Sequence, residues 1–154
     1  MMIFKDADIE AAVKHCAAGK FRNAGQVCIS PTRFFIEEPV YDEFIKSFKS
    51  HVEAINVGDG LDSKSTMGPL VADRRLEVME DFISDAISSG GEVISGGGRG
   101  QSPGSFFEPT LIRDVPDTAK IMIEEPFGPV APSASFSSID EIIERANSLP
   151  FGLA

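Results

Sequence analysis

Segments with helix-like and strand-like patterns alternate along this chain of 154 residues. In the helix-like segments apolar residues recur every three or four positions, and the strand-like segments are short and rich in β-branched or aromatic residues. We expect helices over 9–19, 39–54, 73–89 and 139–147, and strands over 33–36, 92–95, 106–112 and 131–136. This alternation predicts an α/β domain with a mainly parallel open sheet flanked by helices.

The third of these helices has the clearest apolar stripe. Leu76, Met79, Ile83 and Ile87 recur at helical spacing, so we expect all four to be buried. A pair of glycines at 90–91 then ends the helix. No linker or internal repeat divides the chain, and we expect residues 1–154 to form a single domain.

The composition limits the partners and the compartment of the protein. Fourteen basic against twenty-four acidic side chains give a net charge of −10, which argues against nucleic acid or an anionic membrane as a partner. No apolar run approaches the ~20 residues that a membrane span requires. Two cysteines without framework spacing indicate a reducing compartment, and cytoplasm is the simplest location.

Two other features are weak candidates for chemistry. The stretch 96–100 is rich in glycine but lacks the Gly-Lys-Ser/Thr ending of a phosphate loop, so we interpret it as a surface turn. His15 and His51 occupy ordinary solvated helical positions, and no His/Cys/Asp/Glu cluster has the spacing of metal ligands. We therefore expect no metal site.

Cys28 is the candidate nucleophile. An intracellular cysteine is usually a small buried hydrophobe, and Cys16, on an apolar helix face, fits that description. Cys28 instead follows a loop in which Gly25 permits a sharp turn, while Asn23 and Gln26 offer fixed polar groups. Such a loop presents a thiol to a cleft, where nearby N–H groups can receive an oxyanion.

Glu125 is the candidate carboxylate, although adjacent glutamates are normally just a solvated surface. Pro126 excludes Glu125 from the helical region, so its backbone is expected to be extended. The following Phe127 can present an aromatic face beside it. A carboxylate in this setting can accept two hydrogen bonds from the vicinal hydroxyls of a ribose, whereas Glu124 is interpreted as a structural neighbour.

Both segments resemble signatures of the aldehyde dehydrogenase superfamily. Phe-x-Asn-x-Gly-Gln-x-Cys is matched without a gap over residues 21–28, and Glu-x-Phe-Gly-Pro over residues 125–129. The resemblance implies that Cys28 attacks an aldehyde, that hydride passes to NAD or NADP, and that water hydrolyses the resulting thioester. It also implies that Glu125 and Phe127 hold the nicotinamide riboside.

Arg22 suggests a substrate class. An arginine near a helix C-terminus can simply complement the helix dipole. The version of the motif with Arg22 resembles succinate-semialdehyde dehydrogenases, in which this arginine binds the distal carboxylate of the substrate. Some of these enzymes carry a second cysteine two positions after the nucleophile, whereas this chain has Ser30, so that form of redox control is not expected.

The resemblance extends over the whole chain, including segments 6–9, 67–70, 107–110 and 151–154. It implies a partial catalytic domain, without the dinucleotide-binding and oligomerisation segments of the longer enzymes. We therefore expect this chain alone to bind no NAD or NADP and to be inactive. The alternative is a folded fragment that acts only in self-association or partner binding, and a weaker one is residual esterase activity of Cys28.

The same reasoning predicts a homo-oligomer. If the segments that cover this domain are absent, apolar area around Val27, Phe127 and residues 129–132 should be exposed. An apolar patch of more than a few hundred Å² usually finds a partner.

Overall fold

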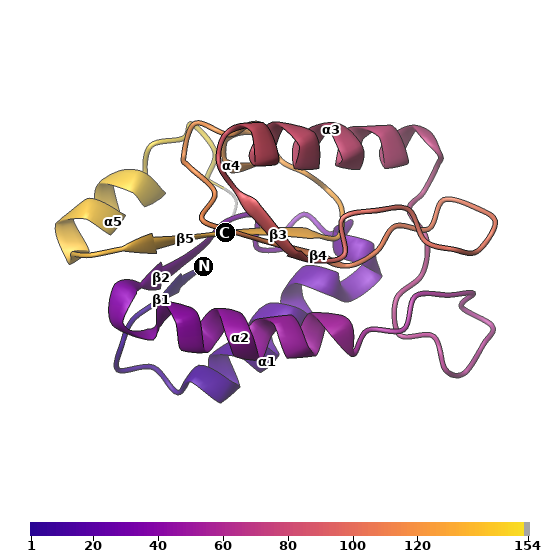
Figure 1. Cartoon of the computed structure of the whole chain (residues 1–154), viewed down its shortest axis with the longest axis horizontal. Coiled ribbons are helices and arrows are strands. Elements are labelled where there is room, and N and C mark those ends of the chain that lie inside the picture. The colour runs from indigo at the N-terminus through magenta and orange to yellow at the C-terminus, as the bar shows by residue number, and fades with distance from the viewer. Residues whose placement is uncertain (153–154) are drawn as a thin grey trace.

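The computed structural model describes residues 1–152 as one five-stranded sheet with helices on both faces (Figure 1). The strand order is β1-β2-β5-β4-β3; all neighbouring strands are parallel except β3, which runs antiparallel to β4. The strands are β1 (Met2–Ile3), β2 (Phe34–Glu37), β3 (Glu92–Ser95), β4 (Thr110–Arg113) and β5 (Val130–Phe136). The predicted α/β fold with a mainly parallel sheet is confirmed.

The helices lie on both faces of the sheet. In Figure 1, α1 and α2 lie below the sheet and α3 and α4 above it, with α5 at one end. The α-helices are α1 (Ile9–Phe21), α2 (Tyr41–Glu53), α3 (Arg74–Ser88), α4 (Lys120–Ile123) and α5 (Ile139–Ala146), and two 3-10 segments are η1 (Arg22–Gly25) and η2 (Glu38–Val40). None of the helices within residues 1–152 combines the length and apolar character needed to cross a bilayer.

An aromatic cluster joins α2 to the sheet. The ring centroid of Phe48 lies 5.3 Å from that of Phe34 on β2 and 5.4 Å from that of Phe44. All three residues are fully buried, and each such side chain contributes about 1.5–3 kcal/mol by leaving water. This packing fixes α2 beneath β2.

Two details of the predicted elements are wrong. Ile87 is 53% exposed, because the apolar stripe of α3 continues from Ile83 to Ala86 and leaves Ile87 facing solvent. The strand expected over 106–112 begins only at Thr110. It is preceded by Pro109, which has no N–H to donate to a sheet ladder, while Phe107 forms a single isolated bridge with Arg99.

The glycine-rich stretch 96–100 lies in the loop between β3 and β4, with Gly96 and Gly97 at positive φ. This agrees with its interpretation as a turn. Leu153 and Ala154, which end the last of the resembling segments, lie outside the described residues.

The expected exposure of residues 129–132 is also wrong. All four are buried, because most of this segment belongs to β5, which pairs with a neighbour on each side. Val27 and Phe127 are half-buried. We expected exposed apolar area at residues 129–132 to favour self-association, and the structure does not expose it there.

Candidate active site

Cys28 lies just after a tightly wound loop at the end of the first helix. Within this loop Asn23, Ala24 and Gly25 have positive φ angles of 51°, 53° and 72°. Three consecutive left-handed residues turn the chain sharply, a conformation that costs energy for the two residues with side chains. The Cys28 side chain that follows is exposed, whereas Cys16 is buried on α1.

Asn23 and Gln26 stabilise this loop through their side-chain amides. Nδ2 of Asn23 donates to the Gln26 carbonyl at 3.1 Å, and Nε2 of Gln26 donates to the Asn23 carbonyl at 3.1 Å. Gln26 also donates to the Pro69 carbonyl at 3.3 Å and accepts from the Val71 N–H at 2.9 Å. The structure thus places both residues in support of the loop; a role in binding an oxyanion stays a prediction.

Gly25 brings the two sequence motifs together. A Cβ at residue 25 would collide with the carbonyl oxygen of Gly128 and would also lie close to the carbonyl of Lys20. Only glycine allows this approach, and its positive φ is a second reason for glycine here. The loop before Cys28 is therefore packed directly on the turn that follows Glu125.

Cys28 and Glu125 line one cavity of about 530 Å³. Ser30 and Phe35 contribute to the same wall, together with the apolar residues Met1, Met2, Met122, Ile123, Leu149 and Phe151. Phe127 is absent from this lining. It lies half-buried in the turn, with a positive φ of 43°.

Arg22 is exposed and does not line the cavity of Cys28. Within residues 1–152 it forms no ion pair or side-chain hydrogen bond with the protein. Its guanidinium is therefore available to a ligand, but the structure does not bring it to the wall that holds the thiol.

Lys20 is a buried cation that the sequence reasoning missed. The residue is 1% exposed, and burial lowers the pKa of its ammonium from 10.5 to about 7, an effect that the charge of Glu125 partly opposes. Its spacing from Val13 and Cys16 places Lys20 on the buried face of α1. That helical spacing was the available signal.

Arg75 on α3 was also missed. One of its terminal nitrogens donates to the carbonyls of Pro126 and Phe127, and its Nε is buried without a partner in the described part of the chain. Burial lowers the pKa of its guanidinium, neighbouring Arg74 lowers it further, and Glu125 opposes both. No pattern distinguishes Arg75 from its exposed neighbour in the sequence.

The residues at the cavity fit a ribose better than a metal ion. The Glu125 carboxylate is exposed and forms no ion pair within the described part of the chain, so both oxygens can accept hydrogen bonds from hydroxyl groups. Among residues 1–152 no group of three or more His, Cys, Asp or Glu side chains is arranged to hold a metal.

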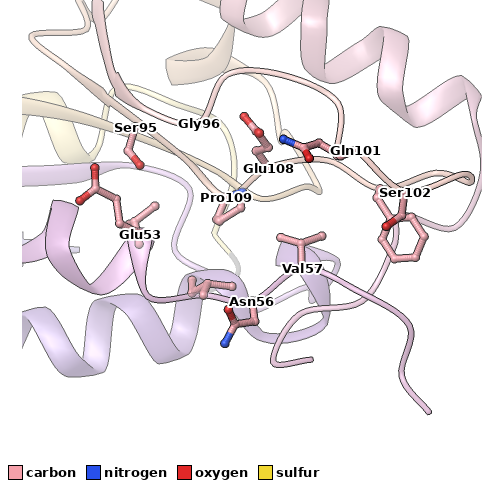
Figure 2. Close-up of a pocket in the computed structure, with 13 residues that line it drawn as sticks. Glu53, Asn56, Val57, Ser95, Gly96, Gln101, Ser102, Glu108 and Pro109 are labelled. Carbon is pink, nitrogen blue, oxygen red and sulfur yellow. The ribbon is translucent and has the colours of Figure 1, made fainter. Parts of the chain in front are cut away.

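Figure 2 shows a second cavity, of about 490 Å³, between the end of α2 and the loops on either side of it. Glu53 and Asn56 line it from the α2 side, and Gln101 and Glu108 from the opposite loop. None of the site residues predicted from the sequence belongs to its wall, whereas the candidate nucleophile Cys28 and the candidate carboxylate Glu125 both line the first cavity.

The family model for the aldehyde dehydrogenase family matches residues 1–154. The chain belongs to the aldehyde dehydrogenase family. It is 44% identical over 153 residues to the probable succinate-semialdehyde dehydrogenase [NADP(+)] of Sinorhizobium fredii, a match that covers 99% of this chain and 31% of that protein. It is 41% identical to the Escherichia coli succinate-semialdehyde dehydrogenase [NADP(+)], with 99% and 32% covered.

Solved aldehyde dehydrogenase structures share this fold. The succinate-semialdehyde dehydrogenase of Burkholderia pseudomallei superposes with a TM-score of 0.97 at 39% identity, covering 99% of this chain and 32% of that one. A 3,6-anhydro-L-galactose dehydrogenase in complex with NAP gives a TM-score of 0.93 at 39% identity, covering 98% and 33%. The chain spans about a third of the length of the relatives that it matches.

Proposed function

We propose that this chain carries the thiol site of an NAD(P)-dependent aldehyde dehydrogenase, with Cys28 as nucleophile. The observation that supports this most is that Cys28 and Glu125, far apart in the sequence, line the same cavity. The Cys28 sulfur adds to the carbonyl carbon of an aldehyde and forms a thiohemiacetal. Bound NAD or NADP would supply the hydride acceptor at this site, and Glu125 and Phe127 would hold its nicotinamide riboside while the Cys28 adduct loses the hydride. Water then hydrolyses the thioester left on Cys28.

The remaining site residues have supporting roles in this proposal. The Glu125 carboxylate accepts hydrogen bonds from the nicotinamide ribose, and Phe127 packs near the nicotinamide ring. Asn23, Gly25 and Gln26 hold the loop that presents the thiol, as their hydrogen bonds and close packing support. Arrangement of this kind lowers an activation barrier by positioning the reacting groups before reaction.

We further propose a carboxylated semialdehyde as the substrate, with Arg22 binding its distal carboxylate. Two observations support this: similar relatives are named as succinate- or glutarate-semialdehyde dehydrogenases, and the exposed Arg22 forms no ion pair within residues 1–152. A guanidinium suits a carboxylate because it can donate two parallel hydrogen bonds.

We expect the chain alone to have no NAD(P)-dependent turnover, because the cofactor contacts that we assign to it reach only the nicotinamide riboside. A cytoplasmic location is part of the same proposal, since both cysteines are free. Self-association also remains a proposal. Its support is now the exposed apolar residues Met2, Ile123 and Phe151 in the wall of the Cys28 cavity.

Acylation by an activated ester tests the nucleophile without any cofactor. The chain is incubated with 4-nitrophenyl hydrogen succinate, and release of 4-nitrophenol is followed together with peptide mapping. The expected product is a succinyl thioester on Cys28, since the thiol displaces 4-nitrophenol from the ester. Cys28→Ser should abolish the thioester, while the matched variant Cys16→Ser should not change the rate. Acylation of Cys16 in preference to Cys28 would contradict the proposal.

The same assay tests the substrate class. 4-Nitrophenyl butanoate has a similar acyl chain but no carboxylate. Arg22→Gln should slow acylation by the succinate ester about two- to fivefold, the effect of losing one exposed ion pair, and leave acylation by the butanoate unchanged. An equal fall with both esters would show that Arg22 supports the loop instead of binding the carboxylate.

A further inference from the structure

The turn that follows Glu125 is strained at Phe127. Its φ of 43° lies in the left-handed region, which costs about 1–3 kcal/mol for a residue with a bulky side chain. A strained residue persists only where its surroundings hold it. The contacts that hold Phe127 therefore also determine the positions of the Glu125 carboxylate and the Phe127 ring relative to Cys28.

Glycine packing holds the turn at one end. Gly128 leaves no room for a side chain, because a Cβ there would collide with the sulfur of Met79 on α3. Its carbonyl is in turn packed against Gly25. These contacts fix the position of residue 128. The carbonyls of residues 126 and 127, however, accept no backbone hydrogen bond from residues 1–152.

Arg75 supplies the partner for both carbonyls. A single terminal nitrogen donates to the carbonyl oxygens of Pro126 and Phe127, so the guanidinium spans the strained residue. Hydrogen bonds from a charged donor are roughly twice as strong as neutral ones. Arg75 stands in the first turn of α3, where Leu76 and Met79 are buried, so the donor is carried by a rigid element.

Burial of part of the Arg75 guanidinium has a free-energy cost that a fully exposed arginine does not have. The Nε of Arg75 is buried and has no hydrogen-bond partner within residues 1–152, which costs about 1–3 kcal/mol. Neighbouring Arg74 is exposed and makes no contact of this kind within residues 1–152. Because the side chain of Arg75 is held in place despite this cost, we interpret its hydrogen bonds to the two carbonyls as its structural role.

We propose that Arg75 is a positioning residue that holds the left-handed turn at Phe127 and thereby sets the Glu125 carboxylate in the wall of the Cys28 cavity, with the Phe127 ring on the same turn. The holding of the turn follows from the geometry alone. Its consequence for a nicotinamide cofactor rests on the function proposed above.

Backbone chemical shifts of Phe127 test the first part, because the 13C shifts of Cα and Cβ report a left-handed φ directly. In Arg75→Met, which keeps the apolar stem but has no donor, these shifts should lose their left-handed signature. The matched control Arg74→Met should keep it. If Arg75→Met does not fold, Arg75→Lys, which lacks the fork, should show the same displacement to a smaller extent. Unchanged Phe127 shifts in whichever variant folds would overturn the inference.

Nicotinamide mononucleotide tests the second part in the same samples. At millimolar concentration it should perturb the Glu125 and Phe127 signals of the original chain and of Arg74→Met, and the perturbation should be lost in Arg75→Met. If Arg75→Met displaces Phe127 but the nucleotide perturbs no variant, the positioning role stands and the cofactor role of this turn fails. Equal perturbation in Arg75→Met would overturn the link between the two.

Discussion

Lys20, at the end of the helix before Cys28, carries a charge that a protein core normally excludes. The ammonium of Lys20 is buried at the base of the Cys28 loop, and the Glu125 carboxylate influences it electrostatically. The backbone of Lys20 is also tied to the segment after the thiol, since its carbonyl accepts a hydrogen bond from the Ser30 hydroxyl at 3.4 Å. Because burial lowers the pKa of the Lys20 ammonium, protonation of Lys20 is coupled to folding.

The stability of the chain should consequently rise with pH through Lys20. Its pKa is about 7 when folded and near 10.5 when unfolded. Between these values the unfolded chain binds more protons, so the free energy of unfolding increases with pH, and this gain is lost as pH falls to 7. Relative to Lys20→Met, the original chain should gain up to about 1.4 kcal/mol per pH unit between pH 7 and 9.

Urea unfolding at pH 7, 8 and 9 measures this difference. Cys16, whose pKa burial raises to about 11, has the opposite pH dependence above pH 9, and its effect cancels because both proteins contain it. Lys14→Met, on the exposed side of the same helix, serves as the control and should parallel the original chain. Parallel curves for the original chain and Lys20→Met would refute the assignment.

The sequence could predict the residues whose chemistry is local and not those whose role comes from tertiary packing. Cys28 follows a glycine-bearing loop, and Glu125 precedes a proline, so both could be singled out from their neighbours alone. Arg75 resembles an ordinary helical cation in the sequence, and the spacing of Lys20 from Val13 and Cys16 indicates burial but no role. Their importance arises because the fold brings Glu125, from a distant segment, close enough for its charge to act on both.

At the scale of elements, the site is a junction between three separate pieces of chain. The loop after α1 contacts the turn before β5 through Gly25 and Gly128, and that turn contacts α3 through Met79. The loop is also tied to Pro69 and Val71, before α3, by Gln26. Each piece is held by the other two, so a change that separates any pair should loosen the whole site.

Replacement of Gly25 tests this junction. Gly25→Ala adds a methyl group against the Gly128 carbonyl and requires a left-handed alanine, so we expect a loss of about 1–3 kcal/mol in the free energy of unfolding. Acylation of Cys28 by the succinate ester should slow as well. Gly68→Ala is the matched control, since a Cβ there meets nothing within 4 Å. If Gly25→Ala were as stable and as reactive as Gly68→Ala, the two loops would not depend on each other.

The order of helices and strands was predictable because hydrophobic periodicity is a local property. The α3 helix begins and ends within a residue of its expected bounds. The two-residue strand β1 and the four-residue helix α4 were not predicted. Elements this short have too few positions to show a period, and they form because neighbouring segments pair with or pack on them.

At the scale of the whole molecule, the contacts proposed for the cofactor are confined to one small region. Glu125 lines the Cys28 cavity, and Phe127 follows it on the same turn. The glycine-rich stretch 96–100 lies instead in the loop between β3 and β4, and it precedes no helix whose N-terminus could bind a phosphate. Within residues 1–152 we therefore assign binding to the nicotinamide half of the cofactor and none to the adenine half.

If this chain contacts only the nicotinamide half, its binding of the two halves of NAD should differ. Interactions with the remote parts of a ligand normally provide the affinity that positions its reactive part. With contacts only to the nicotinamide riboside, NAD should bind with a Kd above about 1 mM, which corresponds to a binding free energy weaker than about −4 kcal/mol. In NMR titrations, nicotinamide mononucleotide should perturb the Phe127 signals as strongly as NAD does, whereas ADP-ribose should perturb none near Cys28. Micromolar binding of NAD, or a response to ADP-ribose equal to that of the mononucleotide, would show that this chain also contacts the adenine half.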